Sequence, residues 1–318
     1  MFKFYFEKEQ KVYQIGNIKV GGQVGENPTV LLGSMFHKGD KIIIDRKKRE
    51  FDKEKAKEYL KKQEEASAKF GVPCMVDIVA NSGDEFKTYI DFVIENTDVP
   101  IGIDAWVAEP KIEAIRYCKE LGIQDKVLYN SITPWAKGGF ERELEVIKEC
   151  GIKNVLVVVF DNEDQTGKGR LKCLDEMMKT IEKYEIENIW VDTSTMNIPA
   201  LSFSGAGAYY IKEKYGFPAG CAPSNGSYAW KAGREMVDRF GFAGIDSAAH
   251  VLSSFMWCDF LFYGPMTAID WVFPAIACAD MMKACMAFEE TGKLPCSENH
   301  PLRKLFPELA DQLSQTKK

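Results

Sequence analysis

Short apolar runs that end in a polar residue recur along this chain about every 30 residues. The polar residues are spaced 27, 26, 31, 31, 33 and 34 positions apart, at Asp77, Asp104, Asn130, Asp161, Asp192, Asn225 and Asp259. Amphipathic patterns with helical spacing lie between them. One strand, one helix and two connections of an α/β barrel use about 31 residues, because eight such units make up roughly 250. The spacing therefore predicts a chain built from repeated strand–helix units.

An eighth apolar run, Thr29–Phe36, precedes this series and completes a set of eight candidate strands. No strand-to-helix turn carries the glycine-rich phosphate fingerprint of dinucleotide-binding sheets, and Gly205-Ala206-Gly207 lies inside a helical pattern instead. Both observations favour an α/β fold of the closed (β/α)8 TIM barrel type over an open doubly wound sheet. A barrel of this kind accommodates residues 1–318 as one domain.

The two ends of the chain extend beyond the eight units. Residues 1–28 contain two short apolar segments around Gly16-Asn17, which suits a two-residue turn, so we expect a β-hairpin that covers one end of the barrel. Asp52 and Gly71 are suited to cap the first helix at its two ends. Three prolines follow Gly292, so we expect residues 292–318 to form an irregular or short-helical extension.

Composition excludes several classes of protein. The net charge of −6 argues against a nucleic-acid partner, which would require a basic face. No apolar run approaches the roughly 20 residues of a membrane span, and the start lacks the apolar core of a signal peptide, so we expect a cytoplasmic protein. Nine cysteines form no C-x-x-C pair. Together with the scattered His37, His250 and His300, this pattern predicts reduced thiols and no protein-bound metal.

The polar residues at the strand ends predict the chemistry of the site. Active sites of α/β barrels lie at the carboxyl ends of the strands, so we expect these residues, with Ser131, to meet at one mouth. The set contains no lysine for a Schiff base and no His or Cys cluster for zinc. Carboxylates and amides suit a neutral heterocycle with adjacent N–H donors, such as a pterin. The simpler alternative is helix capping, for which Asp161 and Asp259 are the best candidates.

Longer motifs resemble one family over most of the chain, from about residue 2 to 285. They are Phe4–Gly22, Gly21–Leu31, Tyr129–Ile132, Phe262–Pro265 and Phe273–Ala275. In these motifs the chain resembles the MtrH subunit of tetrahydromethanopterin S-methyltransferase and its bacterial relatives, which move methyl groups between a corrinoid protein and tetrahydrofolate. The resemblance implies a pterin-binding barrel that acts as a methyltransferase.

The same resemblance implies roles for individual residues. It implies a pterin site formed by Asp77, Asp104, Asn130, Ser131, Asp161, Asp192 and Asn225. Asn225 would face N5 of the pterin, and Asn225 and Asp192 would be the catalytic residues. The methyl group would pass in line between N5 and the cobalt of a corrinoid (cobalamin), so the protein would need no covalent nucleophile.

The same resemblance implies a partner protein. The chain lacks a D-x-H-x-x-G cobalamin-binding motif, so the corrinoid should arrive on a separate protein that docks transiently. Candidate docking residues on the loops around the mouth are Phe36, Trp106, Trp135, Met196 and Phe203. The apolar stretch Ala275–Phe288 would suit either a homodimer interface or core packing.

Alternatives to this interpretation remain open at the level of sequence. Tetrahydrofolate is the expected pterin, and tetrahydromethanopterin is the alternative. A condensing enzyme of the dihydropteroate synthase kind would need a cationic diphosphate site, which the strand ends lack. A non-catalytic subunit that binds a pterin or serves as a scaffold is a further alternative. The carboxylates argue against a pure scaffold, because buried carboxylates cost free energy unless they are paired.

Overall fold

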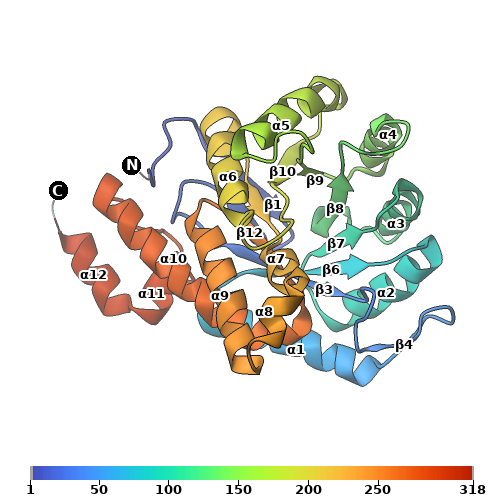
Figure 1. Cartoon of the computed structure of the whole chain (residues 1–318), viewed down its shortest axis with the longest axis horizontal. Coiled ribbons are helices and arrows are strands. Elements are labelled where there is room, and N and C mark those ends of the chain that lie inside the picture. Colours follow the sequence, from blue (N-terminus) through green and yellow to red (C-terminus); the bar gives the residue numbers. More distant parts are fainter. Residues whose placement is uncertain (1–2, 317–318) are drawn as a thin grey trace.

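Eight parallel strands form a closed barrel at the centre of the computed structural model, which describes residues 3–316 (Figure 1). The strands are β3 (Val30–Met35), β6 (Cys74–Val79), β7 (Ile101–Asp104), β8 (Val127–Ile132), β9 (Asn154–Val158), β10 (Asn188–Asp192), β11 (Ala219–Cys221) and β12 (Phe260–Pro265). β12 pairs in parallel with β3 and closes the ring. The predicted (β/α)8 barrel is confirmed.

Helices form the outer layer around this barrel (Figure 1). The main ones are α1 (Lys53–Phe70), α2 (Gly83–Asn96), α3 (Ala108–Glu120), α4 (Glu141–Cys150), α5 (Gly167–Ile181), α6 (Leu201–Tyr215), α9 (Arg239–Phe255) and α10 (Ile269–Thr291). α1 has the predicted caps. The Asp52 side chain accepts a hydrogen bond from the Lys55 backbone nitrogen at 3.0 Å, and Gly71 ends the helix with a φ of 72°, which glycine adopts without strain.

An antiparallel hairpin covers the amino-terminal end of the barrel, as predicted. Its strands β1 (Val12–Ile15) and β2 (Ile18–Gly21) pair in register around the turn. Ile15 and Val20 are fully buried and pack with interior residues of the barrel, including Leu128 and Trp190. A second small hairpin, β4 (Ile43–Asp45) and β5 (Glu50–Phe51), lies between β3 and α1.

The last repeat differs from the prediction. Asp259 precedes β12 instead of following a strand, so it lies at the amino-terminal end of the barrel, where it forms an ion pair of 2.7 Å with Lys212. The apolar residues before Asp259 belong to α9. The connection between β11 and α9 contains two further short helices, α7 (Pro223–Ala229) and α8 (Lys231–Glu235). A buried helical stretch and a buried strand have similar apolar content, which explains the error.

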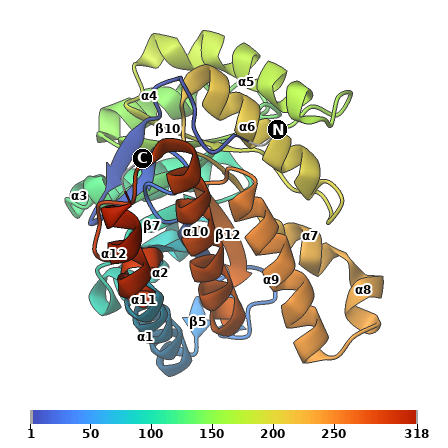
Figure 2. The same ribbon diagram turned by 90° about the vertical axis from the view of Figure 1, so that its left-hand side faces the viewer.

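Two short helices, α11 (Pro301–Leu305) and α12 (Pro307–Gln315), complete the described chain beside α10 (Figure 2). Met266–Thr291, which comprises a 3₁₀ turn and α10, reaches the length and mean hydropathy, 1.3, of a membrane span. It is not an uninterrupted apolar run, because Asp270, Asp280 and Lys283 lie within it, so the prediction about apolar runs is not contradicted. The most apolar 18 residues of this segment are 56% buried inside the protein. The segment also includes the buried Asp280–Lys283 ion pair of 2.8 Å, so α10 has the properties of a core helix.

Candidate active site

A layer of apolar side chains fills the barrel interior. It includes Leu32, Met75, Leu128, Leu156 and Trp190, one from each of five strands. Side chains alternate along a strand, so the residue two positions later on each strand also points inward, one step nearer the carboxyl end. Those residues are Ser34, Asp77, Asn130, Val158 and Asp192. The alternation therefore places polar groups from several strands directly above the apolar layer.

Asp77 and Asn130 form the floor of this polar site. Asn130 Nδ2 donates a hydrogen bond of 3.0 Å to Asp77 Oδ1, and Ser34 Oγ lies 3.4 Å from Oδ2. Asp77 is only 1% exposed. Gly102 is in register with Asp77 on the neighbouring strand, and a Cβ there would lie 2.5 Å from Asp77 Oδ1. Asp77 therefore orients Asn130 and has little surface left for a ligand.

Burial raises the pKa values of three carboxylates at the mouth, and two of them act on the third. Burial raises the pKa of Asp77 to about 6, and it raises the pKa of Asp192 to about 6 against the opposing effects of the Ser194 N–H, 2.7 Å away, and of Arg170. Burial and the charges of Asp77 and Asp192 raise the pKa of Asp104 well above its usual value. The effects of Asp77 and Asp192 on Asp104 indicate that all three side chains lie at one mouth, and Asp77 and Asp104 lie near the carboxyl ends of neighbouring paired strands.

A buried lysine, which the strand-end pattern did not reveal, lies behind this group. Lys111 of α3 donates a hydrogen bond of 2.5 Å to the Ser131 carbonyl oxygen and lies 3.0 Å from Glu143 Oε2. Glu143 also accepts a hydrogen bond from the Tyr129 hydroxyl. The Lys111 charge opposes the rise in the pKa of Asp104. Lys111 thus supports the end of β8 and supplies positive charge near the carboxylates.

Arg170 of α5 is a second buried cation that was not predicted from the sequence. Its guanidinium donates hydrogen bonds to the carbonyl oxygens of Thr193 and, at 3.2 Å, of Ser194. It therefore holds the loop that follows Asp192. Both cations lie on helices, where a search limited to strand ends does not find them. The available signal was a charged residue in a buried stripe: Lys111 precedes Ala114, Ile115 and Cys118 at helical spacing.

Asn225 lies on α7 instead of at the end of a strand. β11 ends at Cys221, and Asn225 is the third residue of the helix that follows it at the carboxyl-terminal end of the barrel. Its side chain is exposed, while Ser224 and Gly226 on either side are buried. The structure therefore places Asn225 at the carboxyl-terminal end of the barrel, on a different kind of element from the one predicted.

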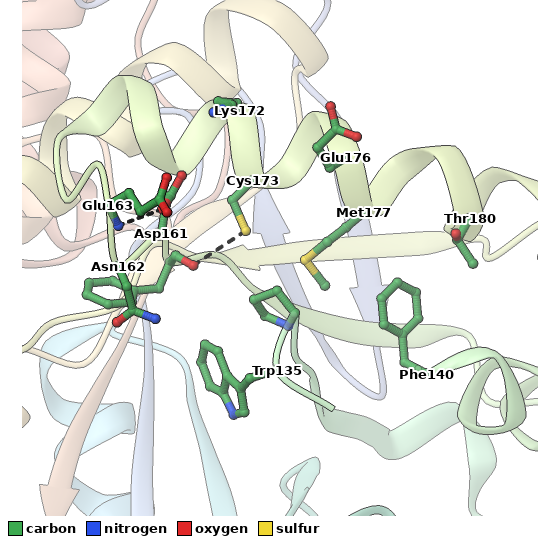
Figure 3. A pocket seen from close by; sticks show the side chains of 12 residues that line it. Trp135, Phe140, Asp161, Asn162, Glu163, Lys172, Cys173, Glu176, Met177 and Thr180 are labelled. Carbon is green, nitrogen blue, oxygen red and sulfur yellow. Dashed lines mark hydrogen bonds between the residues drawn. The ribbon is translucent and has the colours of Figure 1, made fainter. Parts of the chain in front are cut away.

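Asp161 is not brought into the carboxylate group. β9 ends at Val158, and Asp161 Oδ1 accepts hydrogen bonds from the backbone nitrogens of Glu163 at 2.8 Å and Asp164 at 3.3 Å. Together with Trp135 and Cys173, Asp161 lines a separate open groove of about 600 Å³ (Figure 3). The predicted capping role is also wrong, because Thr166 and not Asp161 caps α5. The Asp161 carboxylate instead accepts hydrogen bonds from its own loop.

The profile of one protein family, described as "Tetrahydromethanopterin S-methyltransferase MtrH subunit", matches residues 8–293. The chain belongs to this family. The MtrH subunit of tetrahydromethanopterin S-methyltransferase from Methanopyrus kandleri is 34% identical, over 94% of this chain and 98% of the relative. The same subunit from Methanothermobacter thermautotrophicus is also 34% identical, over 95% of this chain and all of the relative. The protein is therefore a methyltransferase of the MtrH family.

Solved structures related to this MtrH-family chain share its fold. Dihydropteroate synthase from Yersinia pestis, in complex with a sulfonamide drug, superposes with a TM-score of 0.61 at 11% identity, over 86% of this chain and all of the other. The same enzyme from Coxiella burnetii, in complex with pteroic acid, gives 0.59 at 14% identity, over 86% and 99%. At these identities the similarity establishes the (β/α)8 barrel fold alone.

Exposed apolar residues surround the mouth of this MtrH-family barrel. Trp106 is 91% exposed after β7, Trp135 and Met196 are exposed on connections at the carboxyl-terminal end, and Phe203 is exposed in the first turn of α6. The docking prediction is wrong for Phe36, which is fully buried and stacks on Tyr89 with ring centroids 4.0 Å apart. Phe36 therefore belongs to the core.

The thiols and imidazoles are not arranged as a metal site. Between residues 3 and 316, no group of three or more His, Cys, Asp or Glu side chains could hold a metal ion. The nine cysteines are free, in agreement with the prediction of reduced thiols. His250 and His300 are fully buried away from the mouth, in α9 and before α11.

Proposed function

We propose that this MtrH-family methyltransferase moves a methyl group between a corrinoid and N5 of a tetrahydropterin. The observation that carries the proposal is the convergence of Asp77, Asp104 and Asp192 with raised pKa values. Within the described part of the chain, no cation forms a direct ion pair with any of the three. Such a group of acceptors gains most from a ligand that brings several N–H donors.

A pterin ring meets this requirement. Its N3–H and 2-amino group form an edge with two parallel donors, which a carboxylate such as Asp192 or Asp104 can accept together. Asn130 is held by its Nδ2 bond to Asp77, so its oxygen is available to a donor on the ring. Binding of these donors lowers the pKa of the carboxylates, because hydrogen bonds to the ionised form stabilise it.

Methyl transfer itself would take place above this edge, near Asn225. A neutral amide can donate a hydrogen bond to N5 or accept one from it, so it could assist transfer in either direction without a change in charge. The corrinoid, when bound, supplies a cobalt centre that carries the methyl group, and the chain contributes positioning and electrostatics. The exposed Trp106, Trp135, Met196 and Phe203 would contact the protein that carries the corrinoid.

The identity of the tetrahydropterin is part of the proposal. The relatives described above are named for tetrahydromethanopterin, and none of those names refers to folate. They support tetrahydromethanopterin as the substrate, ahead of the tetrahydrofolate expected from the sequence. The carboxylates would contact the ring that both pterins share, so they do not separate the two.

The deciding experiment uses purified protein, methylcobalamin and either tetrahydropterin. We expect loss of methylcobalamin absorbance together with formation of the N5-methyl pterin, faster with tetrahydromethanopterin than with tetrahydrofolate. Calorimetric titration of each pterin in parallel separates binding from turnover. Binding without turnover would favour a pterin-binding scaffold subunit, and neither binding nor turnover would refute the proposal.

A further inference from the structure

Helix α7, which carries Asn225, has only seven residues. A helix of this length is not stable alone in water, so its neighbours must hold it in place. Ser224 Oγ donates a hydrogen bond of 3.1 Å to the Phe262 carbonyl oxygen on β12. Gly226 packs closely on the loop after β10, since a Cβ there would lie 3.1 Å from the carbonyl carbon of Asn197. The residues on both sides of Asn225 are thus fixed.

A buried carboxylate on α9 provides a third anchor for this helix. Ser227 Oγ donates a hydrogen bond of 2.5 Å to Asp246 Oδ1, and Trp271 Nε1 on α10 donates one of 2.7 Å to Oδ2. Asp246 is fully buried and Ser227 is 1% exposed, so the bond between them is shielded from water, whereas the Trp271 bond is partly buried. Asp246 therefore connects three elements, α7, α9 and α10, through one side chain.

We infer that Asp246 is a positioning residue for methyl transfer, acting through Ser227 to fix the orientation of α7 and hence of Asn225. The inference rests on the proposed function, in which Asn225 faces N5. A carboxylate suits the task because it accepts strong, charge-assisted hydrogen bonds on both oxygens, here from two different helices. A displacement of about 1 Å at a reacting group can slow a reaction roughly a hundredfold.

The inference can be tested with Ser227→Ala and Asp246→Asn in the methylcobalamin assay. Each substitution should lower kcat about tenfold, because α7 loses one anchor but keeps the others. The KM for the tetrahydropterin should change less than about twofold, since the carboxylates that would bind the ring, Asp104 and Asp192, lie on β7 and β10. The matched control is Ser253→Ala. Ser253 is buried on α9 but donates only to the Ala249 carbonyl oxygen of its own helix, at 2.8 Å, so kcat should stay at the wild-type value.

A double-substitution cycle separates positioning from general loss of stability. If Asp246 and Ser227 act through Asn225, Ser227→Ala should have no further effect on kcat once Asn225 is alanine. An equal loss of kcat in both backgrounds would overturn the inference. This measurement requires residual activity in Asn225→Ala, so a second readout is needed that does not depend on turnover.

Amide hydrogen exchange provides that readout. Ser227→Ala and Asp246→Asn should speed exchange in residues 223–229 about tenfold or more, whereas Ser253→Ala should leave this segment unchanged. Unchanged exchange in the first two variants would overturn the inference whatever their activity. Absence of turnover in the wild type with either pterin would instead refute the proposed function, and the exchange rates would still report whether Asp246 anchors α7.

Discussion

Asn130 Nδ2 donates a hydrogen bond of 3.0 Å to Asp77 Oδ1, although β7 lies between the strands that carry the two residues. Gly102 of β7 is in register with Asp77, and a Cβ at this position would lie 2.5 Å from the accepting oxygen. The missing side chain of one glycine thus allows two polar residues to meet across a third strand. The floor of the candidate site depends on this contact.

We expect Gly102→Ala to disturb both stability and ligand binding. The added methyl group forces the Asp77 carboxylate to move, and overpacking of this kind costs about 1–3 kcal/mol. Asn130 then loses its acceptor, so tetrahydropterin affinity should fall about tenfold. Urea denaturation and calorimetric titration measure the two effects. Gly244→Ala is the control, since a Cβ there would meet no atom within 4 Å and alanine favours the helix, α9, in which it lies. Reduced stability with unchanged affinity would exclude Asp77 from organising the pterin site.

Asp192 should make the stability of the ligand-free protein depend on pH. Burial raises its pKa from 3.8 to about 6 in the folded state, so the folded protein holds this proton more tightly than the unfolded chain does. Its contribution to stability is therefore fully present below about pH 4 and is lost as the pH rises through about 6. The shift corresponds to at most about 3 kcal/mol.

Asp192→Asn should remove this dependence. The variant should match the wild type near pH 4 and exceed its free energy of unfolding at about pH 7 by up to about 3 kcal/mol. Urea denaturation at intervals across this range measures the difference. If that difference stays constant over the range, Asp192 is not the titrating group.

Lys111→Met should destabilise the protein strongly. The substitution leaves Glu143 buried without its ion-pair partner at 3.0 Å, which costs about 3–5 kcal/mol. Lys111→Met with Glu143→Gln should recover part of this loss, because no unpaired charge remains and Gln can still accept the Tyr129 hydrogen bond. Lys119→Met, at an exposed lysine on the same helix, should change stability by less than about 0.5 kcal/mol. A double variant no more stable than Lys111→Met would argue against an electrostatic cause.

Asn225→Ala should affect turnover far more than binding. One hydrogen bond made in the transition state is worth a few kcal/mol, so kcat should fall roughly a hundredfold while tetrahydropterin affinity changes less than about threefold. Steady-state kinetics and calorimetric titration give the two quantities. The control substitution is Asn162→Ala, at a residue that lines the separate groove after β9. Equal losses in kcat and affinity would make Asn225 a binding residue only.

Substitution of Trp106 should affect methyl transfer, whereas substitution of Phe36 should affect stability. Trp106→Ala removes a side chain that is 91% exposed, so stability should change little, and transfer should slow with a protein-bound corrinoid but not with free methylcobalamin. Phe36→Ala removes a fully buried ring and should cost about 3–5 kcal/mol. Equal slowing of Trp106→Ala with both methyl donors would place Trp106 in the pterin site instead of the docking surface.

The polar residues of the site were predictable where they directly end an apolar strand in the sequence. Asp104 and Asp192 are the last residues of β7 and β10, and the charge of Asp192 contributes to the raised pKa of Asp104. The prediction failed at Asp259, where an apolar helix resembled a strand, and at Asp161, which lies three residues beyond β9. Position within the repeat could not show whether a carboxylate points into the barrel or binds its own loop.

The sequence by itself determined the barrel, because the alternation of strands and helices and the spacing near 31 residues are local patterns. It also determined the family, through motifs spread over the chain. Only the tertiary structure decided which side chains meet. Asn130 reaches Asp77 over 53 positions, and Asp246 anchors Ser227 from another helix. Such contacts depend on how the closed ring and its outer helices bring distant segments together, and no local pattern encodes those distances.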